Sequence, residues 1–101
     1  MGPCVLVADL GATRCRFAIS GSSGLQWATN YDCGAFSGID DAIATYAGHL
    51  PRPLPDAATI ALAGPVKPGR RIRLTNRPWV LDRAAIKARF GFRKLKLLND
   101  F

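Results

Sequence analysis

Short apolar runs and one alternating run dominate the first third of the chain. Residues 4–9 form a continuous apolar run that ends at an aspartate, which is the length of a buried strand. Residues 14–20 alternate, with every second side chain apolar, and predict a half-buried strand that returns across a tight turn at residues 11–13. One face of a third strand is predicted by Leu25, Trp27, Thr29 and Tyr31.

Helical spacing replaces alternation after residue 36. Ser37 is expected to begin a helix, with Asp40 in the position of a capping box. Gly48 is a plausible stop, and the prolines of residues 51–55 forbid continuation. The buried face of this helix is predicted to consist of Ile39, Ile43, Tyr46 and Ala47.

The second half predicts a strand, a helix and a final strand. Residues 58–63 form an apolar strand, and Ile72 and Leu74 indicate a weaker one. A second helix should begin after the N-cap Asp82 and end at Gly91. Residues 94–98 follow as the last strand. This order predicts an α/β fold with a mixed sheet and helices packed on it.

Length and composition suit one globular domain. The chain has 101 residues, of which 49% are hydrophobic, so a disordered chain is not expected. Its apolar runs are all shorter than the roughly 20 residues that span a bilayer. The N-terminus has no basic segment before its apolar run, and Asp9 interrupts that run, so we expect no secretory signal. A cytoplasmic location is predicted, without membrane association.

Positive charge is concentrated in the second half of the chain. The net charge is +7, and residues 57–101 carry eleven Lys or Arg against two Asp. Such a segment can bind a polyanion, but it can equally be a solvated face or one side of a subunit contact. Residues 67–96 could therefore form a small nucleic-acid-binding module, although aromatic residues for base stacking are not interleaved with the arginines.

The cysteines do not predict a metal site. Cys4, Cys15 and Cys33 are odd in number and form no C-x-x-C pair, and His49 has no second ligand at metal-binding spacing. Neither zinc nor a disulfide framework is expected, and the thiols are interpreted as reduced core residues.

Two polar segments could carry chemistry. Asp9-Leu-Gly-Ala-Thr13 joins two predicted strands, and the N–H groups of such a turn can converge on a phosphate while Asp9 holds Mg²⁺. Asn99 and Asp100 directly follow the last strand, where ligands bind in open α/β sheets. Each segment alone could also be an ordinary polar turn.

Together these segments belong to an ordered set of four motifs. They are Asp9-x-Gly-x-Thr13-x-x-Arg16, Leu62-Ala-Gly-Pro-Val66, Leu74-Thr-Asn-x-x-Trp79 and Leu98-Asn-Asp-Phe101. In this order and spacing the chain resembles the N-terminal part of bacterial ATP-dependent glucokinases, in the hexokinase and actin-like ATPase superfamily. The resemblance implies a ribonuclease H-like (actin-like ATPase) α/β fold, with residues 1–101 as the N-terminal lobe of a longer kinase that acts in glycolysis.

The resemblance also implies roles for individual residues. Ala8, Asp9, Leu10, Gly11, Ala12 and Thr13 would form the first phosphate loop of the ATP site. Asp9 would place Mg²⁺, through water, and Asp100 would be the catalytic base that accepts the proton of the sugar 6-hydroxyl. Asn99, Asp100, Thr75 and Asn76 would line the site for glucose or a similar hexose. A homodimer of the full-length enzyme is compatible with the resemblance, and no specific nucleic-acid partner is expected.

Two departures from the family pattern affect the prediction. Ala12 stands where the family has a second glycine, and its Cβ could weaken ATP binding. The sequence ends at Phe101, within the sugar-binding motif, so we expect the missing lobe to be required and the chain alone to have negligible turnover. A non-catalytic remnant that binds only a sugar or a nucleotide is the alternative.

Overall fold

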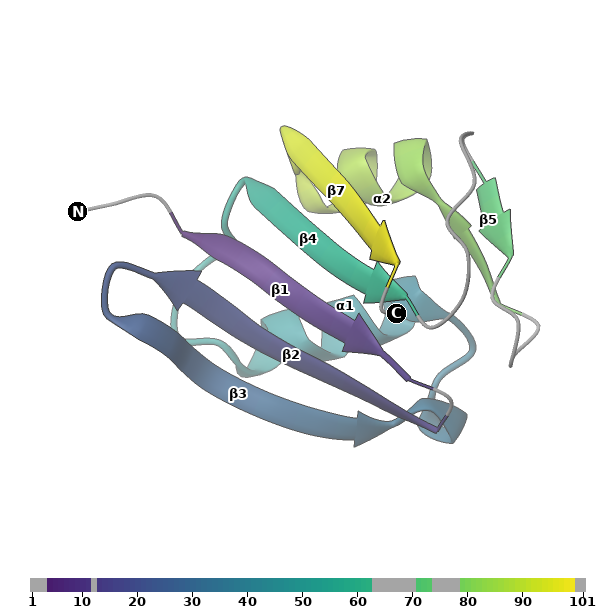
Figure 1. The fold of residues 1–101 in the computed structure, drawn as a ribbon, viewed down its shortest axis with the longest axis horizontal. Helices are drawn as coiled ribbons and strands as arrows, with labels where there is room; N and C mark the ends of the chain where they lie inside the picture. The colour runs from purple at the N-terminus through teal and green to yellow at the C-terminus, as the bar shows by residue number, and fades with distance from the viewer. Residues whose placement is uncertain (1–3, 12, 63–70, 74–78, 100–101) are drawn as a thin grey trace.

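A computed structural model describes residues 4–11, 13–62, 71–73 and 79–99. Its central element is a five-stranded sheet of order β3-β2-β1-β4-β7 (Figure 1). The first three strands pair antiparallel, whereas β4 and β7 run parallel to β1. The strands are β1 Val5–Leu10, β2 Arg14–Gly21, β3 Gly24–Asp32, β4 Ala57–Leu62 and β7 Lys94–Asn99. The mixed sheet predicted from the hydrophobic pattern is thereby confirmed.

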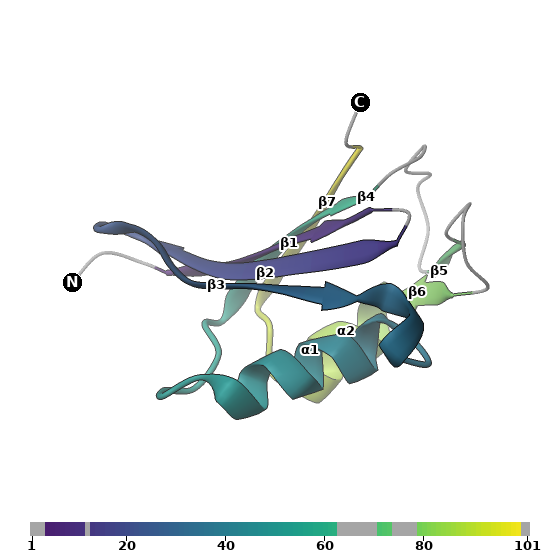
Figure 2. The ribbon, with the colours of Figure 1, turned by 90° about the horizontal axis from the view of Figure 1, so that it is seen from below.

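Both α-helices cover the same face of this sheet. Helix α1 (Ile39–His49) connects β3 to β4, and α2 (Arg83–Phe90) precedes β7 (Figure 2). Alternate residues of β1, β2 and β4 point toward the helices and form the core. The aromatic ring of Phe17 stacks on that of Tyr46 from α1, with 5.2 Å between ring centroids. These contacts bury the helix-facing side of the sheet.

Strand β3 differs from its predicted pattern. Between Phe17 and Ile19 the β2–β3 register shifts, so that Thr29 lies opposite Phe17 while Gln26 lies opposite Ile19. This β-bulge places one extra residue on β3, and Trp27 there adopts a positive φ of 53°. Because the bulge reverses the alternation, Leu25 does not share a face with Thr29 and Tyr31, and it is 66% exposed.

The helix ends are predicted well for α2 and less well for α1. Asp82 caps α2 through its Oδ1, which accepts a hydrogen bond from the N–H of Ala85 at 3.1 Å, and Gly91 ends it in the left-handed conformation. In α1 the N-cap is Gly38, which makes no side-chain cap. The Ser37 hydroxyl instead donates to the Asp41 carboxylate, so the expected capping box with Asp40 is wrong. The helix also continues past Gly48 to His49.

A two-stranded sheet lies beside the main one. Strand β5 (Arg71–Arg73) pairs antiparallel with β6 (Val80–Asp82). The weak strand expected near Ile72 is present, but β6 was not predicted because three residues before a helix cap carry no periodic pattern. Leu74 lies outside the described residues.

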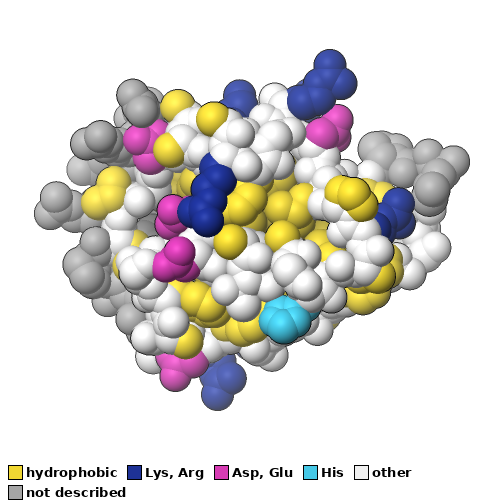
Figure 3. Space-filling view, turned by 180° about the vertical axis from the view of Figure 1, so that it is seen from behind, with side chains coloured by type: hydrophobic (Ala, Val, Ile, Leu, Met, Phe, Trp, Pro, Cys, Tyr) yellow, Lys and Arg dark blue, Asp and Glu magenta, His cyan; other side chains and the backbone are white. Residues whose placement is uncertain are grey.

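The two faces of the main sheet differ in character. Figure 3 shows the helix-covered face, where acidic and basic side chains lie beside each other with apolar side chains visible between them. One ion pair there joins the helices, with Arg89 Nη1 3.0 Å from Asp40 Oδ2. The opposite face of the sheet carries no described helix. Within the described ranges, no helix has the length and apolar character needed to cross a membrane.

Candidate functional site

The three parallel strands bring two of the predicted polar segments to one edge of the sheet. Leu10 of β1 pairs with Leu62 of β4, and Leu62 pairs in turn with Asn99 of β7. Strands in a sheet lie about 4.8 Å apart, so the backbone of Asn99 is about 10 Å from that of Leu10. The turn after β1 and the end of β7 therefore lie on the same side of the molecule, at the carboxyl ends of parallel strands.

The turn that follows β1 is closed by its own backbone. The N–H of Gly11 donates to the carbonyl of Arg14 at 2.9 Å. A Cβ at position 11 would lie 3.2 Å from that same carbonyl oxygen, which explains why glycine occupies it. Because the Gly11 N–H is used within the turn, it is not one of the donors that the sequence offered for a phosphate. Ala12, at the centre of the turn, lies outside the described residues.

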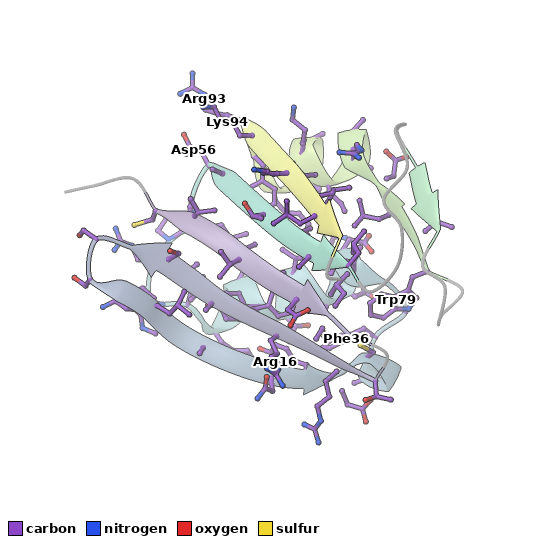
Figure 4. The ribbon with its side chains drawn as sticks, viewed as in Figure 1. Arg16, Phe36, Asp56, Trp79, Arg93 and Lys94 are labelled. Atoms are coloured by element: carbon purple, nitrogen blue, oxygen red, sulfur yellow. The ribbon has the colours of Figure 1, made fainter. Side chains whose placement is uncertain are left out.

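Asp9 occupies the face of the sheet opposite the helices. Its neighbours Ala8 and Leu10 are buried in the core, so only their backbones can contact a ligand. Asp9 Oδ1 is a buried atom. In the β1–β2 pairing Asp9 lies opposite Arg16, an exposed residue that projects from β2 (Figure 4). This strand pair therefore carries a carboxylate and a guanidinium in adjacent positions.

A hollow of about 380 Å³ extends from Asp9 and Arg16 along the face of the sheet opposite the helices. Its walls are mostly apolar, and they include Val7 and Ala18 as well as Leu25 near the bulge of β3. The hollow lies over the sheet rather than beyond the strand ends. Ala8 and Asp9 of the predicted phosphate loop line it, whereas Gly11 and Thr13 do not.

A short 3-10 helix, η1 (Cys33–Ala35), supports the turn from the other side. The N–H of Cys33 donates to the Thr13 carbonyl at 2.8 Å, and its Sγ lies 4.0 Å from the Gly11 carbonyl oxygen. Asp32 caps η1, with Oδ1 accepting from the N–H of Gly34 at 2.9 Å. The sequence interpretation missed this contact, although Asp32-Cys33-Gly34 is itself a recognisable Asx-turn signal.

Several predicted site residues lie beyond what the structure describes. Thr75, Asn76 and Asp100 fall outside the described residues, and of Asn99 only the backbone is described. Trp79, the last residue of the third motif, is 5% exposed and belongs to the core. Trp79 and Phe36 both lie toward the carboxyl-end edge of the sheet (Figure 4).

A second group of ionisable residues lies far from the phosphate turn. Asp56, Arg93 and Lys94 lie at the opposite end of the sheet, with Arg93 Nη1 3.9 Å from Asp56 Oδ2 (Figure 4). Among the described residues, no group of three or more His, Cys, Asp or Glu could hold a metal ion. Burial raises the pKa of the Tyr31 and Tyr46 phenols above 10.0, but both face the core behind the sheet.

Comparison with known proteins identifies the relatives of this fold. The family model described as Glucokinase matches residues 6–101. Glucokinase from Saccharophagus degradans is 40% identical over 101 residues, which cover 95% of this chain and 31% of the relative. Glucokinase from Hahella chejuensis is 36% identical over 98 residues, which cover 95% of this chain and 30% of the relative. The chain thus spans about a third of the length of these curated relatives.

Solved structures agree on the fold. A glucokinase from an Antarctic psychrotroph superposes with a TM-score of 0.89 at 29% identity, covering 100% of this chain and 33% of that one. A putative sugar kinase from Cytophaga hutchinsonii gives a TM-score of 0.72 at 22% identity, covering 96% of this chain and 36% of that one, which supports the fold alone. The actin-like ATPase fold expected from the motifs is confirmed.

Proposed function

The chain belongs to the glucokinase family, and on that premise we propose that residues 1–101 are the N-terminal lobe of an ATP:glucose 6-phosphotransferase. The observation that carries this proposal is the register Leu10–Leu62–Asn99. It sets the β1–β2 turn and the segment that begins at Asn99 about 10 Å apart on one edge of the sheet. A phosphoryl donor and an acceptor hydroxyl bound at these two places would be neighbours.

In this proposal the reaction is an in-line transfer from ATP to the sugar. The oxygen of the 6-hydroxyl forms a bond to the γ-phosphorus, and the bond between that phosphorus and the bridging oxygen of ADP breaks. Asp100 accepts the hydroxyl proton and later releases it to solvent. Asn99, Thr75 and Asn76 bind other sugar hydroxyls and so hold the 6-hydroxyl in line.

The turn of residues 11–13 is assigned to the phosphates of ATP. Its exposed Thr13 can donate from its hydroxyl, and Arg16 lies on the adjacent strand with a positive charge. Ala8 and Leu10 fix the turn by burying their side chains in the core. Ala12 stands where the family pattern has a second glycine, so ATP affinity is expected to be modest.

Asp9 is the residue proposed to hold Mg²⁺. The ion is commonly bound by one or two carboxylates together with waters and substrate phosphates, so a single aspartate beside a phosphate turn fits it. When bound there, Mg²⁺ would neutralise charge on the transferring phosphate. The contact between Asp9 and the ion is proposed to run through water.

Four described basic residues of the second half do not favour the alternative of a nucleic-acid-binding module. Lys87 and Arg89 belong to α2 on the helix-covered face, and Arg89 is paired with Asp40. Lys94 and Lys96 lie on β7 and alternate with Leu95 and Leu97, which pack against the core from the helix side. These four basic side chains therefore divide between two faces rather than forming one stripe.

Replacing Asp100 tests the proposed reaction. In a chimera of residues 1–101 with the remainder of Saccharophagus degradans glucokinase, Asp100→Asn should lower kcat by at least about 10²-fold because the general base is lost. Glucose binding, measured by calorimetry, should persist. Asp56→Asn at the far end of the sheet is the charge-matched control. An Asp100→Asn chimera with normal kcat would remove Asp100 from this role.

A further inference from the structure

The turn between β1 and β2 is contacted by η1, an element that has no role in the reaction proposed above. Helix η1 contacts it at two points, through the backbone N–H of Cys33 to the Thr13 carbonyl at 2.8 Å and through Cys33 Sγ near the Gly11 carbonyl at 4.0 Å. Cys33 is 1% exposed. The turn is therefore held from behind by a fully buried residue of a different strand connection, 20 or more positions away in the chain.

Helix η1 is itself fixed at both of its ends. Asp32 pairs with Arg14 as the last residue of β3 and caps η1 through the 2.9 Å hydrogen bond from the Gly34 N–H. At the other end the ring of Phe36 meets that of Tyr31 edge-to-face, with 5.4 Å between centroids. The position of η1 is consequently determined by its contacts with the sheet and the core, and it does not depend on the turn.

The direction of a peptide group in the turn follows from this contact. A trans peptide directs its N–H opposite to its C=O. Since the Thr13 carbonyl points to Cys33, the N–H of Arg14 faces β1, on the side where the Gly11 N–H donates to the Arg14 carbonyl, and so it lies within the strand pair. The residue that η1 orients for a phosphate is therefore Thr13, whose exposed hydroxyl is the donor assigned to ATP.

We propose that the segment Asp32–Ala35 is a positioning element for the ATP phosphates. Cys33 holds Gly11 and Thr13 of the β1–β2 turn, and the Asp32 carboxylate keeps Cys33 in place by capping η1. This inference rests on the function proposed above, and it extends that function to two residues outside the four sequence motifs. Neither residue touches the reacting atoms, so each acts through the turn.

Substitutions of Asp32 can separate the effect of its η1 cap from the effect of its negative charge on ATP binding. Asp32→Asn keeps an oxygen that accepts from the Gly34 N–H but removes the negative charge. Loss of that charge near bound phosphates should leave ATP affinity equal or slightly higher. Asp32→Ala removes both charge and cap, and it should raise the dissociation constant for ATP at least about threefold relative to Asp32→Asn. The two variants thus separate the effect of the lost cap from the effect of the lost charge.

Cys33 provides an independent pair of variants. Cys33→Ser retains a donor toward Gly11, whereas Cys33→Ala loses it and leaves a small cavity beside the turn. Cys15→Ala is the matched control, because Cys15 is also buried but lies on β2 with its side chain in the core. Cys33→Ala should weaken ATP binding more than Cys33→Ser, while Cys15→Ala should not change it.

The experiment is an amide-resolved NMR titration of the 101-residue chain with ATP and Mg²⁺, for the wild type and these variants, with hydrogen exchange of the Gly11 N–H recorded in parallel. Weaker binding and faster Gly11 exchange in Asp32→Ala, but not in Asp32→Asn, support the proposal. Equal affinities for these two variants overturn it. No ATP-dependent shift in the wild type contradicts the proposed function as well, whereas shifts that all variants share contradict the positioning role alone.

Discussion

Gly11 shows how one residue sets the geometry of the proposed phosphate turn. Its N–H donates to the Arg14 carbonyl at 2.9 Å, and a Cβ would approach that oxygen to 3.2 Å. Contacts of this length require the backbone to move. The sequence interpretation placed a tight turn here from the glycine, but it could not determine that the Gly11 N–H closes the turn. Hydrogen bonds within a turn depend on dihedral angles that residue type does not fix.

Two alanine substitutions should therefore have opposite effects on stability. Gly11→Ala should lower the free energy of unfolding by about 1 kcal/mol, because the new methyl group displaces backbone. Gly48→Ala, in α1 with no atom within 4 Å of the added Cβ, should raise it by about 0.5–1 kcal/mol through helix propensity. Urea unfolding followed by circular dichroism measures both. Equal effects of the two substitutions would contradict the tight closure of the turn.

At the scale of the elements, the features that depend on residues close in sequence were predicted. The cap at Asp82 and the stop at Gly91 give α2 correctly, since both depend on neighbours within one helical turn. The bulge of β3 and the extra strand β6 were not predicted, because each depends on pairing with a distant segment. The contact of η1 with the β1–β2 turn was missed for the same reason.

Removal of the α2 cap tests one of these local signals. Asp82→Ala should reduce the free energy of unfolding by about 1 kcal/mol, because the Ala85 N–H loses its acceptor. Asp82→Asn retains an acceptor oxygen and should stay within a few tenths of a kcal/mol of the wild type. Thermal or urea unfolding provides the comparison. If both variants lost the same stability, the charge of Asp82 rather than its cap would be the source.

For the molecule as a whole, the arrangement matches the fold of about a third of a solved glucokinase chain. The parallel strands β1, β4 and β7 present their carboxyl ends on one edge, and the chain spans about a third of the length of its curated relatives. The sequence pattern predicts Asp9 and Asn99 each at the end of a strand, and the strand register brings the two ends to one edge. The sequence does not predict that Arg16 lies opposite Asp9, because the register depends on how the two strands pair.

The isolated chain should bind ligands far better than it turns them over. Without a second lobe to close on the sugar and exclude water, glucose-dependent ADP formation by the purified 101-residue chain should be at least about 10³-fold below the rates of 1–100 s⁻¹ typical of kinases. A coupled assay with Asp9→Asn as a background control measures it. Turnover within the ordinary kinase range would contradict the requirement for a second lobe.

The most direct test of the central claim is the position at which ATP binds. Amide shifts of the ¹⁵N-labelled chain should be recorded during titration with ATP and Mg²⁺. We predict that the shifts concentrate at Gly11, Thr13 and Arg14 and at the ends of β4 and β7. A response concentrated at Arg93 and Lys94, at the opposite end of the sheet, would contradict the account and indicate nonspecific attraction of phosphate to basic side chains.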